Sequence, residues 1–532
     1  MRRWNGWGDD AIDFALNEDM LGFLRARVGE SKPPADATLA EACRTVLPSR
    51  LAPHKAIDAT PEVRLRHAFG QSLPDWLRLR YGRIVSVPDG VAFPESSGQV
   101  RELLDYARRI DAVVIPYGGG TSVVGHLTAP ENGKAVITVD LSRLSNLIDF
   151  DPQAQLATFG AGIAGPDLEA QLRARGYTLG HFPQSFEYST LGGWIVTRSS
   201  GQQSLRYGRI EQLFAGGRLE TPTGTLAIPT FPASAAGTDL REIVLGSEGR
   251  MGILTEATVR ITSLPQREAF HAAFFPHWAE AEDAVRSIAQ AKLPLSMLRL
   301  SNPVETQTTL AMAGHNRMIG LLQAYLRMRG CGEQKCMLLL GASGDTASVA
   351  HALNQALRIA GDHRGVHAGA AIGEKWKQNR FRNVYLRNVL WQRGYAVDTV
   401  ETAVDWPRVR GMMQSVEQAA RDALSAFGER VHAYTHLSHM YAQGASVYTT
   451  FAYRLAGRYD EDLARWKAMK GAVCTAIVAN GGTISHQHGV GVDHAPYLQA
   501  EKGALGIGAI RELCRHFDPT GMMNPGKLLP TA

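Results

Sequence analysis

Glycine, serine and threonine gather in one stretch with the composition of an anion-binding loop, PYGGGTSVVGH at Pro116–His126. Three consecutive glycines, Gly118–Gly120, stand directly after a short apolar run, Ala112–Ile115. Without Cβ atoms, the backbone N–H groups of such a loop can approach an anion closely, and Thr121 and Ser122 add hydroxyl donors. We interpret the stretch as a candidate diphosphate site; a flexible turn is the alternative that these residues leave open.

Two familiar phosphate-binding loops are excluded at this place. The stretch does not end in Gly-Lys-Ser or Gly-Lys-Thr, which a P-loop requires. It also lacks the Gly-x-Gly-x-x-Gly spacing that opens the long helix of a Rossmann dinucleotide site. A nucleotide bound here therefore requires another fold.

Three further stretches rich in Gly, Ser and Thr follow: FPQSFEYSTLGGW at 182–194, TRSSG at 197–201 and GSEGRMGILTEA at 246–257. One such loop would be weak evidence, because these residues are also the usual components of turns. Four of them close together in the chain favour a backbone that wraps around a long polar ligand. Independent turns remain the alternative.

The elements that must position these loops are short strands and helices. Ahead of the first loop, Val100, Leu103, Leu104 and Ala107 recur at the spacing of one helical face, and a strand follows at Ala112–Ile115. Further β-runs are AVITVDL, LATFGAGI and GILTEATVRIT, and GPDLEAQLRARG is a helix with Pro166 in its first turn. Residues 1–83 read as mainly helical, and residues 267–500 as longer amphipathic helices with fewer clear strands.

Composition limits the class of protein. A chain of 532 residues, 45% hydrophobic and 20% charged, is expected to form two or three packed units. No apolar run is long enough for a membrane span, and no secretion signal is recognised. The five scattered cysteines are interpreted as reduced thiols of a cytoplasmic protein. Because no targeting signal is recognised, a bacterial enzyme is expected. A net charge of +5 with dispersed basic residues suits acidic metabolites or a peripheral membrane contact, and gives no evidence for nucleic-acid binding.

The order of the four loops resembles the FAD-binding domain of the vanillyl-alcohol oxidase superfamily, of the PCMH type. The resemblance implies an α+β protein: a mainly helical region at 1–83, an FAD-binding domain of two α/β subdomains at 84–266, an α+β cap or substrate domain at 267–500, and a C-terminal segment at 501–532 that packs back on the FAD domain. It implies non-covalent FAD, because the first loop is Gly-Gly-Gly where some members have a tethering histidine, and His126 just beyond it is expected to be structural. The implied cofactor-binding residues are Pro116, Tyr117, Gly118, Gly119, Gly120, Thr121, Ser122, Gln184, Ser185, Ser189, Thr190, Thr197, Arg198, Ser199, Ser200, Glu248, Gly249, Gly252, Ile253 and Leu254.

Within that superfamily the chain is similar to the alkylglycerone-phosphate synthase family over nearly its whole length, from RWNGWG at 3–8 to ANGGTISHQHGVG and DPTGMMNPGKLL. The likeness implies a redox-neutral transferase of ether lipid biosynthesis. Such an enzyme exchanges the acyl chain of acyl-dihydroxyacetone phosphate for a long-chain fatty alcohol through an adduct at flavin N5. A homodimer is expected.

The same resemblance assigns roles to individual residues. Tyr448 is the implied acid/base, and its phenol would need nearby positive charge to lower its pKa. Arg387, in VYLRN, is expected to grip the acyl carboxylate, and Arg299 to help form the site. Further catalytic candidates are His181, His486 and His488. The family has three consecutive histidines where this chain has Gln487 in the middle, which puts any role of that middle position in doubt.

A flavin-dependent 2-hydroxy-acid dehydrogenase of the D-lactate or D-2-hydroxyglutarate type is the rival interpretation. Those enzymes hold a divalent metal with two histidines and a glutamate. Here Tyr448 and Gln487 stand where the second histidine and the glutamate would be, so no metal site is predicted. The spacing His-x3-His-x2-His at His432, His436 and His439 is a weak alternative metal site.

Overall fold

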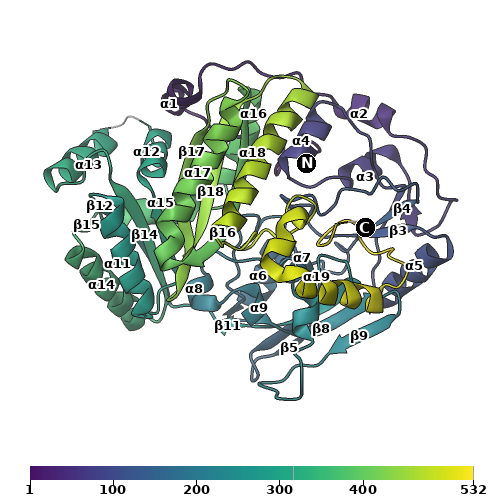
Figure 1. The fold of residues 1–532 in the computed structure, drawn as a ribbon. Coiled ribbons are helices and arrows are strands. Elements are labelled where there is room, and N and C mark those ends of the chain that lie inside the picture. The colour runs from purple at the N-terminus through teal and green to yellow at the C-terminus, as the bar shows by residue number, and fades with distance from the viewer. Residues whose placement is uncertain (315–316, 531–532) are drawn as a thin grey trace.

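The computed structural model describes residues 1–314 and 317–530, in which helices surround three main sheets (Figure 1). The first sheet has the order β1 (Ile57–Asp58), β2 (Gly90–Ala92), β4 (Val136–Asp140) and β3 (Val113–Tyr117), and its last three strands are parallel. The predicted helix is α5 (Ser97–Arg109), which buries Val100, Leu103 and Leu104 against Ile137 and Val139 of this sheet.

The second sheet is antiparallel, with the order β5 (Leu147–Asp151), β6 (Leu156–Gly160), β10 (Ile253–Arg260), β8 (Phe214–Thr221) and β9 (Gly224–Ile228). Its apolar face packs against the short helices of the same region. These helices and two flanking strands are α6 (Gly165–Arg173), α7 (Leu191–Val196), α8 (Ser204–Tyr207), α9 (Ile210–Leu213), α10 (Arg241–Val244), β7 (Tyr177–Thr178) and β11 (Thr262–Ser263).

The third sheet lies beyond residue 266 and has seven strands. Its order is β15 (Val366–His367), β12 (Arg267–Phe275), β14 (Cys336–Gly344), β13 (Met297–Ser301), β17 (His432–Met440), β18 (Gly444–Arg454) and β16 (Tyr395–Asp405). The helices of this region are α11 (Trp278–Gln290), α12 (Pro303–Met312), α13 (Arg317–Met328), α14 (Thr346–Asp362), α15 (Ala371–Asn379), η1 (Asn383–Tyr385), α16 (Leu386–Gln392), η2 (Trp406–Arg408), α17 (Val409–Ser425) and α18 (Tyr459–Ala479).

As expected, the described part of this region has fewer strands than residues 84–266, but all of its strands join in one sheet and one of them is hard to recognise from its sequence. Strand β14, CMLLLGASG, is buried along almost its whole length, so its residues do not alternate between apolar and polar types. Without that alternation a strand is difficult to distinguish from a buried helix by its sequence. The α+β class itself is confirmed.

The N-terminal and C-terminal segments of the chain contact the regions of these sheets. The N-terminal region contains α1 (Glu18–Val28), α2 (Leu39–Thr45), α3 (Pro61–Arg66) and α4 (Leu73–Arg80), and its Trp7 exchanges two backbone hydrogen bonds with the Asn388 side chain on α16. After η3 (Ala495–Tyr497), helix α19 (Leu498–Phe517) ends beside the second sheet, where the Phe517 carbonyl accepts a hydrogen bond from Thr223, and Met523 pairs with Val114 of β3.

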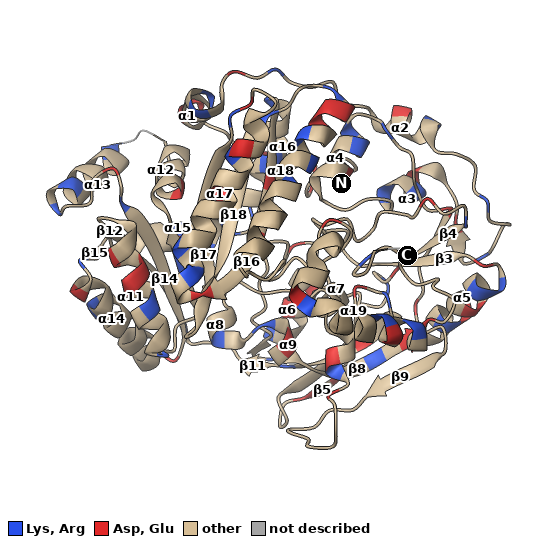
Figure 2. Ribbon diagram, viewed as in Figure 1, with Lys and Arg blue, Asp and Glu red and all other residues tan. Residues whose placement is uncertain are grey.

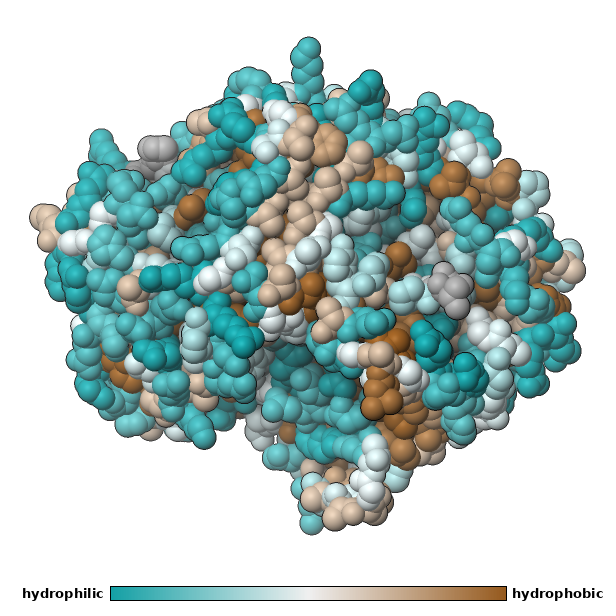
Figure 3. Space-filling view, in the orientation of Figure 1, coloured by the Kyte–Doolittle hydropathy of each residue, from teal (hydrophilic) through white to brown (hydrophobic). Residues whose placement is uncertain are grey.

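The surface carries mixed charge. Figure 2 shows Lys and Arg interspersed with Asp and Glu on the helices of this view. On the face shown in Figure 3, apolar patches are separated by hydrophilic residues, and a hollow lies below the centre of the view. Within residues 1–314 and 317–530, no helix has the length and apolar character needed to cross a membrane.

Candidate active site

The Gly118–Gly120 loop follows strand β3 and packs so closely on the 188–190 segment that no side chain fits. A Cβ on Gly119 would collide with the carbonyl oxygen of Tyr188, and one on Gly118 with the Thr190 hydroxyl. Gly120 has φ +62°, a conformation that favours glycine. The glycine backbone therefore lines a cavity directly.

A cavity of about 460 Å³ begins at this loop and extends to side chains of β13, β17 and β18 in the third sheet. Of the predicted cofactor-binding residues, all except Arg198 and Ile253 lie on its wall. Arg198 instead pairs with Glu242 beside a neighbouring cavity of about 500 Å³. The wall fits a long dinucleotide, because glycine backbone alternates with the hydroxyls of Thr121, Ser122, Ser189, Thr190, Ser199 and Ser200.

Arg387 reaches this cavity from α16. It donates hydrogen bonds to the carbonyl oxygens of Gln71 and Val397, and its guanidinium carbon lies 4.3 Å from the centre of the Trp76 ring. Its Nη2 has no hydrogen-bonding partner in the described part of the chain. Burial lowers the pKa of Arg387, and the charge of Asp398 opposes that effect. The fixed guanidinium thus offers unused donors to an anionic ligand.

The register of the third sheet places three side chains in one row. His436 on β17 and Glu401 on β16 are the partners of Tyr448 on the intervening strand β18. Opposite residues of neighbouring strands project from the same face, which is why the His436 and Tyr448 rings stack with centres 4.8 Å apart. Arg299 approaches the same row from β13, where it binds Glu305 at 2.6 Å.

Tyr448 is enclosed by protein, and this sets its acidity. Burial raises the pKa of the phenol, while a hydrogen bond from Thr399 and the charge of Arg299 act in the opposite direction. The expected lowering by nearby positive charge is therefore outweighed by burial in the protein alone. At neutral pH the hydroxyl carries its proton.

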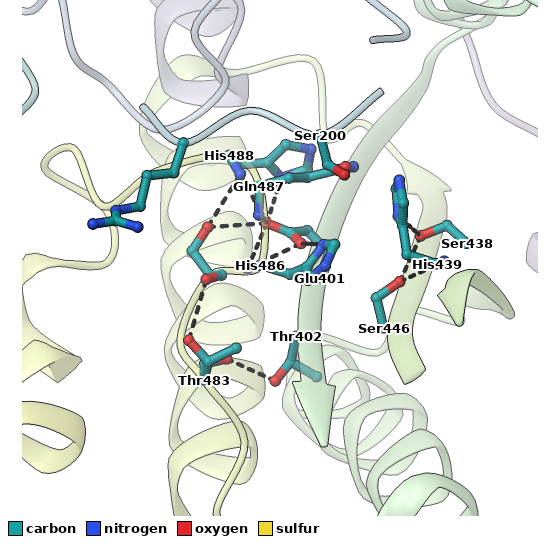
Figure 4. A network of polar contacts seen from close by, with 12 residues as sticks. Ser200, Glu401, Thr402, Ser438, His439, Ser446, Thr483, His486, Gln487 and His488 are labelled. Carbon is teal, nitrogen blue, oxygen red and sulfur yellow. Dashed lines mark hydrogen bonds and ion pairs between the residues drawn. The ribbon is translucent and has the colours of Figure 1, made fainter. Parts of the chain in front are cut away.

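Glu401 organises the HQHG segment (Figure 4). Its carboxylate accepts hydrogen bonds from the backbone N–H groups of His486, Gln487 and His488 and from the Ser485 hydroxyl, at 2.8 to 3.0 Å. The side chain is almost fully buried. Burial would raise the pKa of Glu401, but His488, His486 and these hydrogen bonds hold it well below its usual value.

The two predicted histidines of this segment face different cavities. His488 lines the first cavity and meets the edge of the Tyr448 ring with centres 5.8 Å apart. His486 lines the second cavity, where its Nε2 lies 2.7 Å from both the Tyr441 hydroxyl and Arg209. Burial lowers the pKa of both imidazoles.

His181 lies apart from the cavity wall. It packs on the Trp194 ring, and its Nε2 is 3.3 Å from the Ser199 hydroxyl, which does line the cavity. Burial lowers its pKa to about 3, so the ring is neutral. His126, expected to be structural, lines the cavity and links Ser122 to Glu248 at 2.7 and 3.0 Å.

Sequence reasoning missed Glu401, Glu305 and Asp398. They lie in TVETAVD, NPVETQ and YAVD, which show no motif. Strand pairing places Glu401 and Asp398 on β16 beside β18, and Glu305 on α12 is located by its contacts with Arg299 and His436. The histidines at 432, 436 and 439 bind different partners: Thr308, Glu305 and the carbonyl of Gly201. Within residues 1–314 and 317–530, no three His, Cys, Asp or Glu side chains are grouped to hold a metal ion.

Comparison with known proteins defines the class first. Residues 88–228 match the family model "FAD binding domain", and residues 264–528 match "FAD linked oxidases, C-terminal domain". Together with the cavity, these matches show a FAD-binding protein of the vanillyl-alcohol oxidase type.

The particular family follows from its relatives. The chain is 32% identical to an alkyldihydroxyacetonephosphate synthase of Dictyostelium discoideum, over 88% of this chain and 77% of that one. It is 28% identical to the synthase of Trypanosoma brucei brucei, over 99% and 92%. A solved structure of an alkyldihydroxyacetonephosphate synthase superposes with a TM-score of 0.84 at 27% identity, covering 98% of each chain. The chain belongs to the alkyldihydroxyacetonephosphate synthase family, which confirms the resemblance inferred from the sequence.

Glu401→Gln tests whether this carboxylate holds the 485–488 segment. Because a neutral amide replaces a charged acceptor, the free energy of unfolding should fall by about 2 kcal/mol. Because the folded state lowers the pKa of Glu401, the ionised carboxylate adds to the free energy of unfolding above its unfolded-state pKa of ~4.3. That stabilisation is lost as pH falls through the folded-state pKa. The difference from wild type, measured by urea unfolding, should therefore shrink in acid.

Glu501→Gln is the matched control, since Glu501 binds Thr483 and the backbone of Ile484 just before this segment, from a less buried position. Glu501→Gln should lower the free energy of unfolding by less than Glu401→Gln does. Equal losses in the two variants would contradict a special role for Glu401.

Proposed function

We propose that this protein catalyses the exchange of the acyl chain of an acyl-dihydroxyacetone phosphate for a long-chain fatty alcohol, which forms an ether lipid precursor. One observation carries the proposal: a single cavity joins the dinucleotide wall to Arg387, Arg299 and Tyr448. A cofactor, an anionic substrate and an acid/base group would thus meet in one space. The family supports this activity, since its named relatives are alkyldihydroxyacetonephosphate synthases.

The cap side of the cavity suits lipid chains. Apolar side chains from α12, β14 and α16 line it: Met312, Met337, Leu339, Leu386 and Leu390. Burial of methylene groups against such a wall contributes about 0.8 kcal/mol each, which favours long chains. The two arginines supply cations for the phosphate and for the departing carboxylate.

The residues divide the chemistry among them. Tyr448 exchanges a proton at C1 of the substrate, and Arg387 holds the carboxylate that leaves. FAD, held by the glycine loops, would supply an electron-rich ring nitrogen for chemistry at C1. Arg299 places a positive charge near Tyr448, and the His488 ring contacts the Tyr448 ring.

The 2-hydroxy-acid dehydrogenase is the weaker alternative. Its metal-binding residues are replaced here by Tyr448 and Gln487, and the remaining histidines bind separate partners. A substrate as small as lactate would also leave the apolar cap wall unused.

Three finer points belong to the same proposal. FAD is bound non-covalently, the enzyme works in the cytoplasm at the surface of a membrane, and two copies form a homodimer. The membrane contact is supported by lipid substrates that partition into bilayers. Vesicle flotation and analytical ultracentrifugation test the last two points.

Acid denaturation should release the flavin completely. Gly118–Gly120 offer no nucleophile, and no cysteine lies on the wall of the cavity among the described residues. Absorbance of the supernatant after precipitation measures the release. Flavin fluorescence that stays with the polypeptide on a denaturing gel would show a covalent bond.

The purified protein with palmitoyl-dihydroxyacetone phosphate and hexadecanol should form the hexadecyl ether, with release of one palmitate for each ether. Mass spectrometry of both products measures this ratio. Ether formation without added electron acceptor is expected, because the exchange is redox-neutral. Dye reduction with D-lactate or D-2-hydroxyglutarate and no ether product would favour the dehydrogenase instead.

Arg387→Lys should lower kcat/KM for the acyl substrate by about 10- to 100-fold. Lysine keeps the charge but loses the paired donors and the stacking on Trp76, a loss of roughly 1.5–3 kcal/mol for a charged hydrogen bond. Arg382→Lys, five residues earlier and exposed, is the control and should behave as wild type. Equal kinetics of the two variants would remove Arg387 from the site.

A further inference from the structure

His436 has two ring nitrogens in different surroundings. Its Nδ1 lies 2.9 Å from Oε2 of Glu305 and 3.2 Å from Nη2 of Arg299. That Nη2 itself lies 2.6 Å from the other oxygen of Glu305. The carboxylate therefore stands between two potential donors in a buried position, since both Glu305 and His436 are less than 10% exposed.

This geometry fixes the position of the imidazole proton. Burial would raise the pKa of Glu305, but His436 and Arg299 hold it below its usual value, so the carboxylate is ionised and only accepts hydrogen bonds. If Nδ1 carried no hydrogen, a lone pair would face this carboxylate at 2.9 Å, which is repulsive. Nδ1 therefore bears the proton, and Nε2 presents a lone pair.

The Nε2 atom is free to act on a ligand. No residue within 1–314 and 317–530 forms a hydrogen bond with it, and His436 lies on the wall of the cavity. The ring is held by its stacking on Tyr448, at an interplanar angle of 22°. A carboxylate that fixes the tautomer of an imidazole whose other nitrogen faces a ligand is the arrangement of a general base.

The proposed exchange, on which this inference rests, removes two protons: one from C1 and one from the hydroxyl of the incoming alcohol. A single tyrosine serves one of them. We propose that His436 is a second catalytic base, which takes the alcohol proton at Nε2 while Glu305, as a positioning residue, holds the proton on Nδ1.

The step balances without an oxidant or reductant. The alcohol O–H bond breaks and its proton moves to Nε2; the alcohol oxygen uses its electron pair to form the ether bond to C1. Across the whole exchange, the bond from C1 to the acyl oxygen breaks and the carboxylate keeps that electron pair, and the proton that Tyr448 takes from C1 is returned to C1. The proton then passes from His436 to solvent.

Burial and the charged groups around His436 determine the pKa of its imidazole. It faces Arg299 from β13, Glu305 from α12 and Tyr448 from β18, and Tyr434 lies two residues earlier on the same strand. Burial and Arg299 lower the pKa of His436, and Glu305 opposes them. The imidazole is therefore neutral and basic near pH 7, and ether formation should decline as pH falls below the ordinary histidine value of ~6.5.

Two assays on the FAD-loaded protein separate this base from Tyr448. The first measures exchange of labelled palmitate into palmitoyl-dihydroxyacetone phosphate without alcohol; the second measures ether formation with hexadecanol. His436→Asn keeps a donor near the Nδ1 position and removes Nε2. It should retain palmitate exchange but lose ether formation by about 10²- to 10⁴-fold. Tyr448→Phe should lose both.

Bound-flavin absorbance and melting temperature show that the variants are folded, and His432→Gln, on the same strand, is the control for loss of a buried histidine. Glu305→Gln gives a second test: its ether rate should fall, and the acidic limb of its pH profile should move to lower pH because the imidazolium loses its carboxylate. Ether formation at the wild-type rate in His436→Asn, or an equal loss of exchange and ether formation, would overturn the proposal. A wild-type protein that makes no ether would instead refute the proposed function.

Discussion

The site depends on charged side chains that are buried against the third sheet, where water does not solvate them. Protein donors must take the place of that water. Glu401 is the strongest case, because a buried carboxylate is tolerated only when several donors surround it. Those donors are consecutive backbone N–H groups of 486–488, so the segment must curl around the end of the carboxylate. This constraint places His488 against Tyr448 and turns His486 toward the neighbouring cavity.

A second buried carboxylate, Glu305, imposes a similar order on the other side of Tyr448. It binds Arg299 and His436 together, and the three residues come from a strand, a helix and another strand of the cap. Tyr448 thus lies between two organised acidic groups, each with its own imidazole. The raised pKa of the phenol is a direct consequence of this dry setting.

The cofactor wall and the cap reach the same cavity only because distant parts of the chain hold them together. Asn388, next to Arg387, exchanges hydrogen bonds with Trp7, while Arg2 at the N-terminus binds the carbonyl of Gly119. The C-terminal segment returns to strand β3, where Asn524 binds the carbonyl of Val114 and its side chain binds that of Glu248. A change at either end of the chain would therefore reach both the cofactor loops and the cap.

The sequence by itself determined the glycine loops, the helix at 97–109, the class of fold and the family, because each of these is encoded locally or in the order of motifs along the chain. Tyr448, Arg387 and His488 could likewise be chosen by their places in those motifs, and the structure brings them to one cavity. Only the tertiary structure decided that Glu401, Tyr448 and His436 form one row and that Glu305 faces His436. Such pairs depend on strand register and on the burial of charge, and a shift of one residue along a strand would turn each side chain to the opposite face.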